Sequence, residues 1–185
     1  LYSHHHADQT HGINDLRIFF IKRKKKIPIY CDNETKNYLL KNFEYCFKNT
    51  TSYPAILQFK NIKKNNLFKD GNENLNIKSI KVKHGKVECC GFVINDKCAY
   101  LSDVNMIYKK DYKYFKNLKY FIIDCLRYED HPSHFNLNQV LSLIKILNPK
   151  TTILTNLHTD LDYNELKKKL PKNVLPAYDG MNFNL

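Results

Sequence analysis

The sequence lacks the marks of several large classes of protein. Its 185 residues contain no apolar run of membrane-spanning length, and no signal peptide is visible. It has no Gly-x-Ser-x-Gly elbow and no P-loop, so it offers neither an activated serine nor a common nucleotide-phosphate cradle. Internal repeats and linkers rich in proline, glycine or serine are also missing. These absences predict one domain with a sizeable core and no membrane partner.

Paired cysteines are missing as well. The chain has six cysteines, none of them in C-x-x-C spacing, and most lie in apolar, strand-like runs such as 89–93. Buried, reduced thiols in a cytosolic protein are the simplest explanation. The cysteine pattern therefore predicts a cytoplasmic location.

Acidic residues are scarce relative to basic ones. The chain has 18 Asp and Glu against 30 Lys and Arg, which gives a formal net charge of +12. A basic surface suits phosphodiester or nucleic-acid substrates. Lysine and asparagine are abundant everywhere, however, as in proteins from AT-rich genomes, and this bias explains the charge equally well. Nucleic acid is therefore left open as a partner.

Apolar periodicity predicts strands that alternate with helices after an antiparallel meander. Asp32 or Asn33 is expected to cap one helix, and Asn136 with Gln139 has the spacing of a capping box for another. The expected strands are 27–31, 56–62, 75–83, 87–94, 98–102, 120–124, 151–155 and 174–185, and the expected helices are 12–21, 33–47, 136–148 and 162–170. This order indicates an α/β fold with two sheets sandwiched between helices.

The densest cluster of metal-binding side chains lies at residues 4–8, His-His-His-Ala-Asp. Imidazole and carboxylate are the ligands that zinc and its neighbours prefer. In an extended chain His4 and His6 share a face while His5 points away, and Asp8 follows where the chain turns, well placed for a second metal. The run could instead be the end of a purification tag, but it continues without a break into a helical pattern.

The histidines as a set fall in or just beyond predicted strand ends, and none lies within a predicted helix. They are His4, His5, His6, His11, His84, His131, His134 and His158. Polar side chains gathered where strands stop are typical of the functional site of an α/β protein. The distribution predicts one polar site built from several distant segments.

Three further polar residues follow buried strands. Asp103 can bridge two cations with its two oxygens, or it can simply cap the next turn. Asp124 can orient a ligand histidine, and Arg127 can pair with a substrate phosphate.

The segment 3–17 resembles the signature loop of the metallo-β-lactamase-fold hydrolases, closest to the branch with the phosphonate-pathway cyclic phosphodiesterase and tRNase Z. The family pattern His-x-His-x-Asp-His is matched at His4, His6 and Asp8 and departs at Gln9. A glutamine amide is a poor zinc ligand. The second metal is therefore expected to be weaker, to be absent, or to recruit His11.

Later segments resemble the family's other motifs, through residues 176–181 near the end. The resemblance implies that His84 is a ligand of the first metal and that Asp103 bridges the two metals. The family's last ligand is commonly the histidine of Leu-Thr-His, but here Asn156 follows Leu-Thr. His158 is the candidate ligand instead, because two residues further along an extended chain it points to the same side. Gln9 and Asn156 both affect the second metal, so a one-metal enzyme is a serious alternative to a rearranged two-metal site.

The resemblance implies a single metallo-hydrolase domain over residues 1–185 of the αββα type, without the family's N-terminal strands. It implies one or two Zn²⁺ ions, or Mn²⁺, and a metal-activated hydroxide that attacks a phosphodiester, of which a small cyclic one is an example. Asp8 would orient the hydroxide, and His131 or His134, in a loop similar to one on the substrate side in relatives, would be the general acid. His134 could alternatively cap the following helix.

Two other functions stay open at this point. A tRNase Z-like nuclease fits the basic charge, although no inserted arm for gripping tRNA is visible. A degenerate relative that binds only metal or nucleic acid fits the departures at Gln9 and Asn156. A homodimer is an assembly that the sequence allows but does not require.

Overall fold

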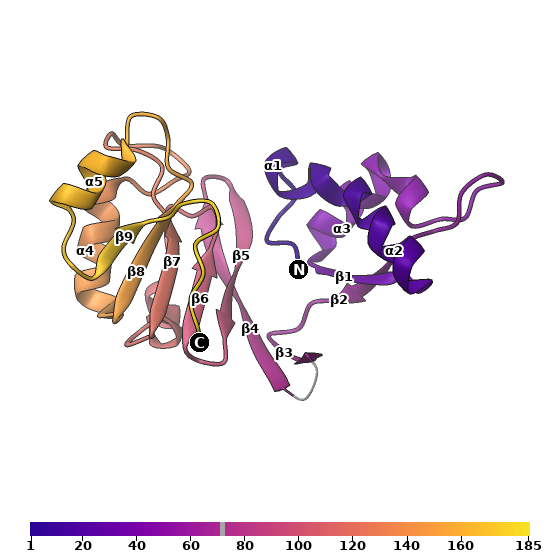
Figure 1. The fold of residues 1–185 in the computed structure, drawn as a ribbon, viewed down its shortest axis with the longest axis horizontal. Helices are drawn as coiled ribbons and strands as arrows, with labels where there is room; N and C mark the ends of the chain where they lie inside the picture. Colours follow the sequence, from indigo (N-terminus) through magenta and orange to yellow (C-terminus); the bar gives the residue numbers. More distant parts are fainter. Residues whose placement is uncertain (71–72) are drawn as a thin grey trace. The chain divides into compact units, whose positions relative to one another are not determined.

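The computed structural model describes residues 1–70 and 73–185, and these form two compact units, residues 1–63 and 64–185 (Figure 1). Each unit combines helices with its own sheet. The predicted α/β class is confirmed.

The first unit wraps short helices around a two-stranded parallel sheet. Its elements are α1 (Ala7–Thr10), the 3-10 helix η1 (His11–Leu16), α2 (Arg17–Arg23), β1 (Ile27–Cys31), α3 (Asn33–Asn42), the 3-10 helix η2 (Glu44–Cys46) and β2 (Leu57–Asn61). Ile13, Ile29 and Leu39 are buried at the centre of its core. The expected cap is present, because the Asp32 side chain accepts a hydrogen bond from the backbone N–H of Thr35 at 2.9 Å.

The helix expected at 12–21 differs in detail from the observed one. Its first part is the 3-10 helix η1, and the α-helix α2 begins only at Arg17. A 3-10 helix has three residues per turn rather than 3.6, so its side chains point in other directions than those of the continuous α-helix that was expected. Leu16 and Phe20, two of the apolar residues of this segment, pack against the core, whereas Phe19 is 50% exposed. The helix expected at 33–47 likewise ends at Asn42 and is followed by η2.

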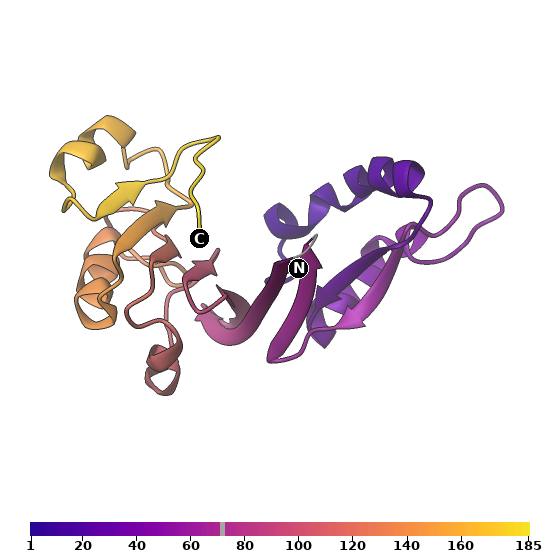
Figure 2. The same ribbon diagram turned by 60° about the horizontal axis from the view of Figure 1, so that its bottom comes forward.

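The second unit is built on a seven-stranded sheet in which sequence order and spatial order agree. Its elements are β3 (Asn65–Asp70), β4 (Glu73–His84), β5 (Val87–Ile94), β6 (Cys98–Leu101), the 3-10 helix η3 (Lys109–Tyr114), β7 (Tyr120–Asp124), α4 (Leu137–Leu147), β8 (Thr151–Thr155), α5 (Tyr163–Lys169) and β9 (Val174–Pro176). Strands β3 to β6 are antiparallel, and β6 to β9 are parallel (Figure 2).

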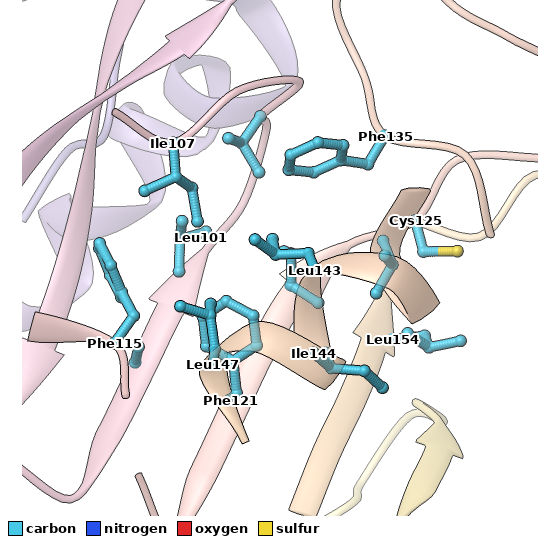
Figure 3. Close-up of a cluster of buried hydrophobic side chains, with 14 of the residues drawn as sticks. Leu101, Ile107, Phe115, Phe121, Cys125, Phe135, Leu143, Ile144, Leu147 and Leu154 are labelled. Atoms are coloured by element: carbon cyan, nitrogen blue, oxygen red, sulfur yellow. The ribbon is translucent and has the colours of Figure 1, made fainter. Parts of the chain in front are cut away.

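Hydrophobic side chains from the sheet and from α4 form the core of the second unit (Figure 3). Phe121 on β7 and Leu147 on α4 are completely buried, and Leu154 on β8 lies in the same cluster. Strands β7 and β8 are short apolar runs whose buried side chains pack against α4, which explains why they could be recognised from their composition. All six cysteines are buried and free, as predicted.

Two stretches of the second unit differ from the prediction. Strand β3 was not expected, since its polar sequence NNLFKD gives no alternation of the usual kind. The strand-like region expected at 174–185 contains only β9. In the part of the chain that the structure describes, none of the helices has the length and apolar character needed to cross a bilayer.

The capping box of α4 should be a measurable source of stability. The Asn136 side chain accepts from the Gln139 N–H at 2.8 Å, and the Gln139 side chain accepts from the Asn136 N–H at 3.0 Å. Asn136→Ala should therefore lower the free energy of unfolding by about 1–2 kcal/mol. Urea denaturation would measure this, and Asn138→Ala, an exposed change in the same turn, should have little effect.

Candidate metal centre

The chemistry-bearing residues of the second unit share one edge of its sheet. Strand β4 is antiparallel to β5, and β5 is antiparallel to β6, so β4, β6, β7 and β8 all run the same way. Their carboxyl ends therefore meet at a common edge, which is where α/β sheets usually bind ligands. His84 ends β4, Asp103 follows β6, Asp124 ends β7 and Asn156 follows β8.

His84 and Asp103 form a buried pair at this edge. Their side chains are 3% and 5% exposed, and His84 Nε2 lies 3.7 Å from Asp103 Oδ2. The other ring nitrogen, Nδ1, donates a hydrogen bond to the backbone carbonyl of Ser133 at 2.7 Å. A neutral ring with its proton on Nδ1 presents the Nε2 lone pair to the carboxylate. His84 Nε2 and Asp103 Oδ2 both offer lone pairs, so their close approach is stabilised when a cation or a proton lies between them.

Asp124 is the hub of a second buried cluster. It is completely buried and accepts three hydrogen bonds: from the Val104 N–H at 2.9 Å, from His134 Nδ1 at 2.6 Å and from the Asn156 amide at 3.1 Å. Val104 follows Asp103, so this carboxylate ties together the loops after β6, β7 and β8. The ring of His134 in turn lies 4.6 Å, centroid to centroid, from the ring of His84.

The loop between β7 and α4 carries the remaining polar groups. His131 Nδ1 accepts from the backbone N–H of Ser133 at 3.3 Å, and its contact with the Ser133 hydroxyl is 3.2 Å. Burial, and then the neighbouring His134 and Arg127, hold the pKa of His131 below its usual value of 6.5. Arg127 donates from Nη2 to the backbone carbonyl of Asp130 at 2.6 Å, so it holds this loop in shape.

In the first unit, His4 and His6 form a pair of their own. Their rings meet edge to face with centroids 4.5 Å apart, and one ring nitrogen of each lies within 4.8 Å of the other. His4 is buried and contacts the Ser3 hydroxyl through Nδ1 at 3.1 Å. His5 turns the other way, toward Glu34 at 3.8 Å and the ring of Tyr38. This arrangement is the alternation expected from the sequence.

The residues after this pair have different surroundings. Asp8 is exposed on α1, and the Gln9 amide donates to Asp8 Oδ2 at 3.2 Å. His11 Nε2 lies 3.2 Å from the Tyr38 hydroxyl, and its ring packs edge to face on Phe43.

Comparison with known families agrees with these observations. A family model described as the beta-lactamase superfamily domain matches residues 1–156, which is most of the chain and includes every residue just described. The chain belongs to this superfamily. No match was found among curated proteins.

Solved structures place this superfamily member with the metallo-β-lactamase-fold hydrolases. A diphosphatase from the PhnP family is 26% identical, with a TM-score of 0.85 over 97% of this chain and 67% of its own. The metallo-β-lactamase-fold protein YhfI from Bacillus subtilis is 19% identical, with a TM-score of 0.74 over 97% of this chain and 73% of its own. The short form of human tRNase Z is 16% identical, with a TM-score of 0.65 over 97% and 76%. The predicted family is confirmed, and its fold implies a divalent metal.

Within each unit of this metallo-β-lactamase-fold hydrolase, most of the predicted site residues lie together. The second unit gathers His84, Asp103, Asp124, His131, His134 and Asn156, and the first unit gathers His4 and His6. Asp8 lies beside Gln9 on α1. His134 does not cap α4, because Asn136 does so.

Two predicted ligands lie among other partners. His11 is engaged with Tyr38 and Phe43, as described above. His158 is 57% exposed in its side chain, and its Nδ1 lies 2.7 Å from Asp160 Oδ1. The positive φ of 61° at Asn156 explains this, because a left-handed residue breaks the extended alternation that would have put positions 156 and 158 on the same side.

Sequence reasoning missed the part that Ser133 and Gly85 play. The Ser133 carbonyl fixes the tautomer of His84, and Gly85 lets the two loops approach, since a Cβ at Gly85 would lie 2.8 Å from Ser133 Cβ. Gly85 also has φ +58°, which favours glycine. The His-Gly dipeptide was the only signal available for this contact.

Gly85→Ala should weaken metal binding. The added methyl group would push Ser133 away and disturb the hydrogen bond that orients His84, and losing such an outer hydrogen bond typically costs 10- to 100-fold in metal affinity, as an order of magnitude. Competition with a chromophoric chelator would measure the affinity. Gly12→Ala, where a Cβ meets nothing within 4 Å, is the matched control and should bind metal as the unaltered protein does.

Proposed function

We propose that this protein is a metal-dependent phosphodiesterase in which His4, His6, His84 and Asp103 bind a divalent ion, zinc or manganese. Three imidazoles and one carboxylate form a donor set that suits either metal. Support comes from the two preformed pairs, His4 with His6 and His84 with Asp103, one in each unit. The observation that carries the proposal is the second pair, in which Nε2 and a carboxylate oxygen are buried face to face.

The chain's own groups suit cleavage of a bond to phosphorus. A bound divalent ion supplies Lewis acidity and lowers the pKa of a water ligand to about 7. Asp124 orients His134 through Nδ1 and would stabilise its protonated form, which leaves Nε2 to give a proton to the leaving oxygen. The similar diphosphatase of the PhnP family supports phosphorus chemistry, at 26% identity. We favour small phosphodiesters, including cyclic ones, as substrates.

The test is hydrolysis of bis-p-nitrophenyl phosphate by the purified chain. Activity should disappear on treatment with a chelator and return on addition of Zn²⁺ or Mn²⁺. His6→Ala should abolish both metal binding and hydrolysis, whereas His5→Ala, the neighbouring imidazole that faces Glu34 and Tyr38, should preserve them. A folded chain that binds no divalent ion, or one that binds the ion without hydrolysing the diester, would refute the proposal and favour the degenerate relative.

A tRNase Z-like nuclease is the second candidate, and the observation that favours it is the net charge of +12. Cleavage of precursor tRNA that falls steeply as salt rises, while hydrolysis of the small diester does not, would support this candidate. Equal salt dependence for both substrates would leave the small diester as the preferred substrate.

A further inference from the structure

We propose that this chain binds one divalent ion rather than two, because Gln9 and Asn156 supply side-chain amides, hydrogen-bonded to neighbouring carboxylates, where a second ion would need imidazoles. The inference rests on the proposed function, since it concerns the same centre. Its basis is a hydrogen-bonding pattern that recurs in both units of the chain.

Asn156 supplies this pattern in the second unit. Its Nδ2 donates to Asp124 Oδ1 at 3.1 Å and lies 3.4 Å from His134 Nδ1. An amide NH₂ group is a donor only, so it contributes no lone pair to a cation. The amide N–H thus directs a partial positive charge at the buried carboxylate of Asp124, as a metal ion would.

Asp124 needs no further positive partner. Three N–H groups already converge on its two oxygens, from Val104, His134 and Asn156. A buried carboxylate with this many donors is satisfied without a cation. His134 Nδ1 is committed to the same carboxylate, so neither side chain is available as an additional metal ligand through these atoms.

Gln9 repeats the arrangement in the first unit. Its Nε2 donates to Asp8 Oδ2 at 3.2 Å, directly after the His4 and His6 pair. The two imidazoles that could replace these amides as ligands are held by other groups, His11 by Tyr38 and Phe43 and His158 by Asp160. His4, His6, His84 and Asp103 together supply four ligands, which is the number that a tetrahedral site for one ion needs.

The stoichiometry of bound metal tests the inference directly. The intact chain, equilibrated with excess Zn²⁺ or Co²⁺ and dialysed, should retain one ion per chain by elemental analysis. The double variant Gln9→His, Asn156→His should retain two, because each change replaces an amide donor with an imidazole that has a lone pair. Far-UV circular dichroism would verify that the double variant is folded.

The matched control adds two histidines elsewhere. Gln58→His, Asn164→His makes the same two kinds of change at exposed positions on β2 and α5 and should keep one ion. Two tightly held ions in the unaltered chain would overturn this inference and leave the proposed function standing. No bound ion in the folded, unaltered chain would overturn both. A folded double variant that still retains one ion would refute the assigned role of the amides.

Discussion

Asp124→Ala should cost about 3–5 kcal/mol in the free energy of unfolding, the range expected when one partner of a buried charged pair is removed. The carboxylate is completely buried, and its loss would leave the N–H groups of Val104, His134 and Asn156 without their acceptor. A buried donor that loses its acceptor still carries the full cost of its removal from water. An exposed donor would instead form a hydrogen bond with water. Urea denaturation followed by circular dichroism would measure the difference.

Two variants make this prediction specific. Asp124→Asn keeps the volume but turns one oxygen into an NH₂ donor that faces another donor, so it should also destabilise the fold, by less than Asp124→Ala. Asp160→Ala removes the partner of His158 in an exposed pair and should have no measurable effect on stability. If Asp124→Ala and Asp160→Ala unfolded at the same urea concentration, the hub role of Asp124 would be wrong.

Strands β7 and β8 could be predicted from the sequence because their physical cause is local. Each is a short apolar run inside the sheet that packs against α4, and a polar residue at or just after its last position marks the carboxyl end. The same logic located His84, Asp103 and Asp124, since each of them stands where a strand ends. The α4 cap was equally visible, because a capping box is a pattern of four consecutive positions.

What the sequence did not predict depends on the conformation of single residues or on contacts between distant loops. The assignment of His158 as a ligand assumed extended backbone through Asn156, whereas Asn156 has a positive φ and its side chain is hydrogen-bonded to Asp124. The bond from His84 to the Ser133 carbonyl joins positions 49 residues apart and involves a backbone atom, which has no sequence signature. The polar strand β3 pairs with β4 through its backbone, so its side chains gave no indication of it.

His134→Ala should lower the rate of phosphodiester hydrolysis by about 10²- to 10⁴-fold for substrates with poor leaving groups, the usual contribution of a positioned general acid. Asp124 holds the ring through Nδ1 at 2.6 Å, so Nε2 is the nitrogen left to donate a proton. An alkoxide needs that proton as it departs, whereas p-nitrophenolate is stable without it. A series of diesters with leaving groups of graded basicity would therefore show a loss that grows with basicity.

His131 is the matched control, because it lies in the same loop with its ring centroid 5.0 Å from that of His134. The Nδ1 of His131 accepts a hydrogen bond from the Ser133 N–H, and burial holds the pKa of His131 below 6.5. At neutral pH the protonated form of His131, which is the form that acts as a general acid, is therefore the minor one. His131→Ala should consequently produce a small loss that does not depend on the leaving group. A steep dependence in His131→Ala together with a flat one in His134→Ala would assign the proton to the other histidine. Equal, flat losses in both variants would mean that neither imidazole protonates the leaving oxygen, and that the pair of Asp124 and His134 serves only to hold the loop.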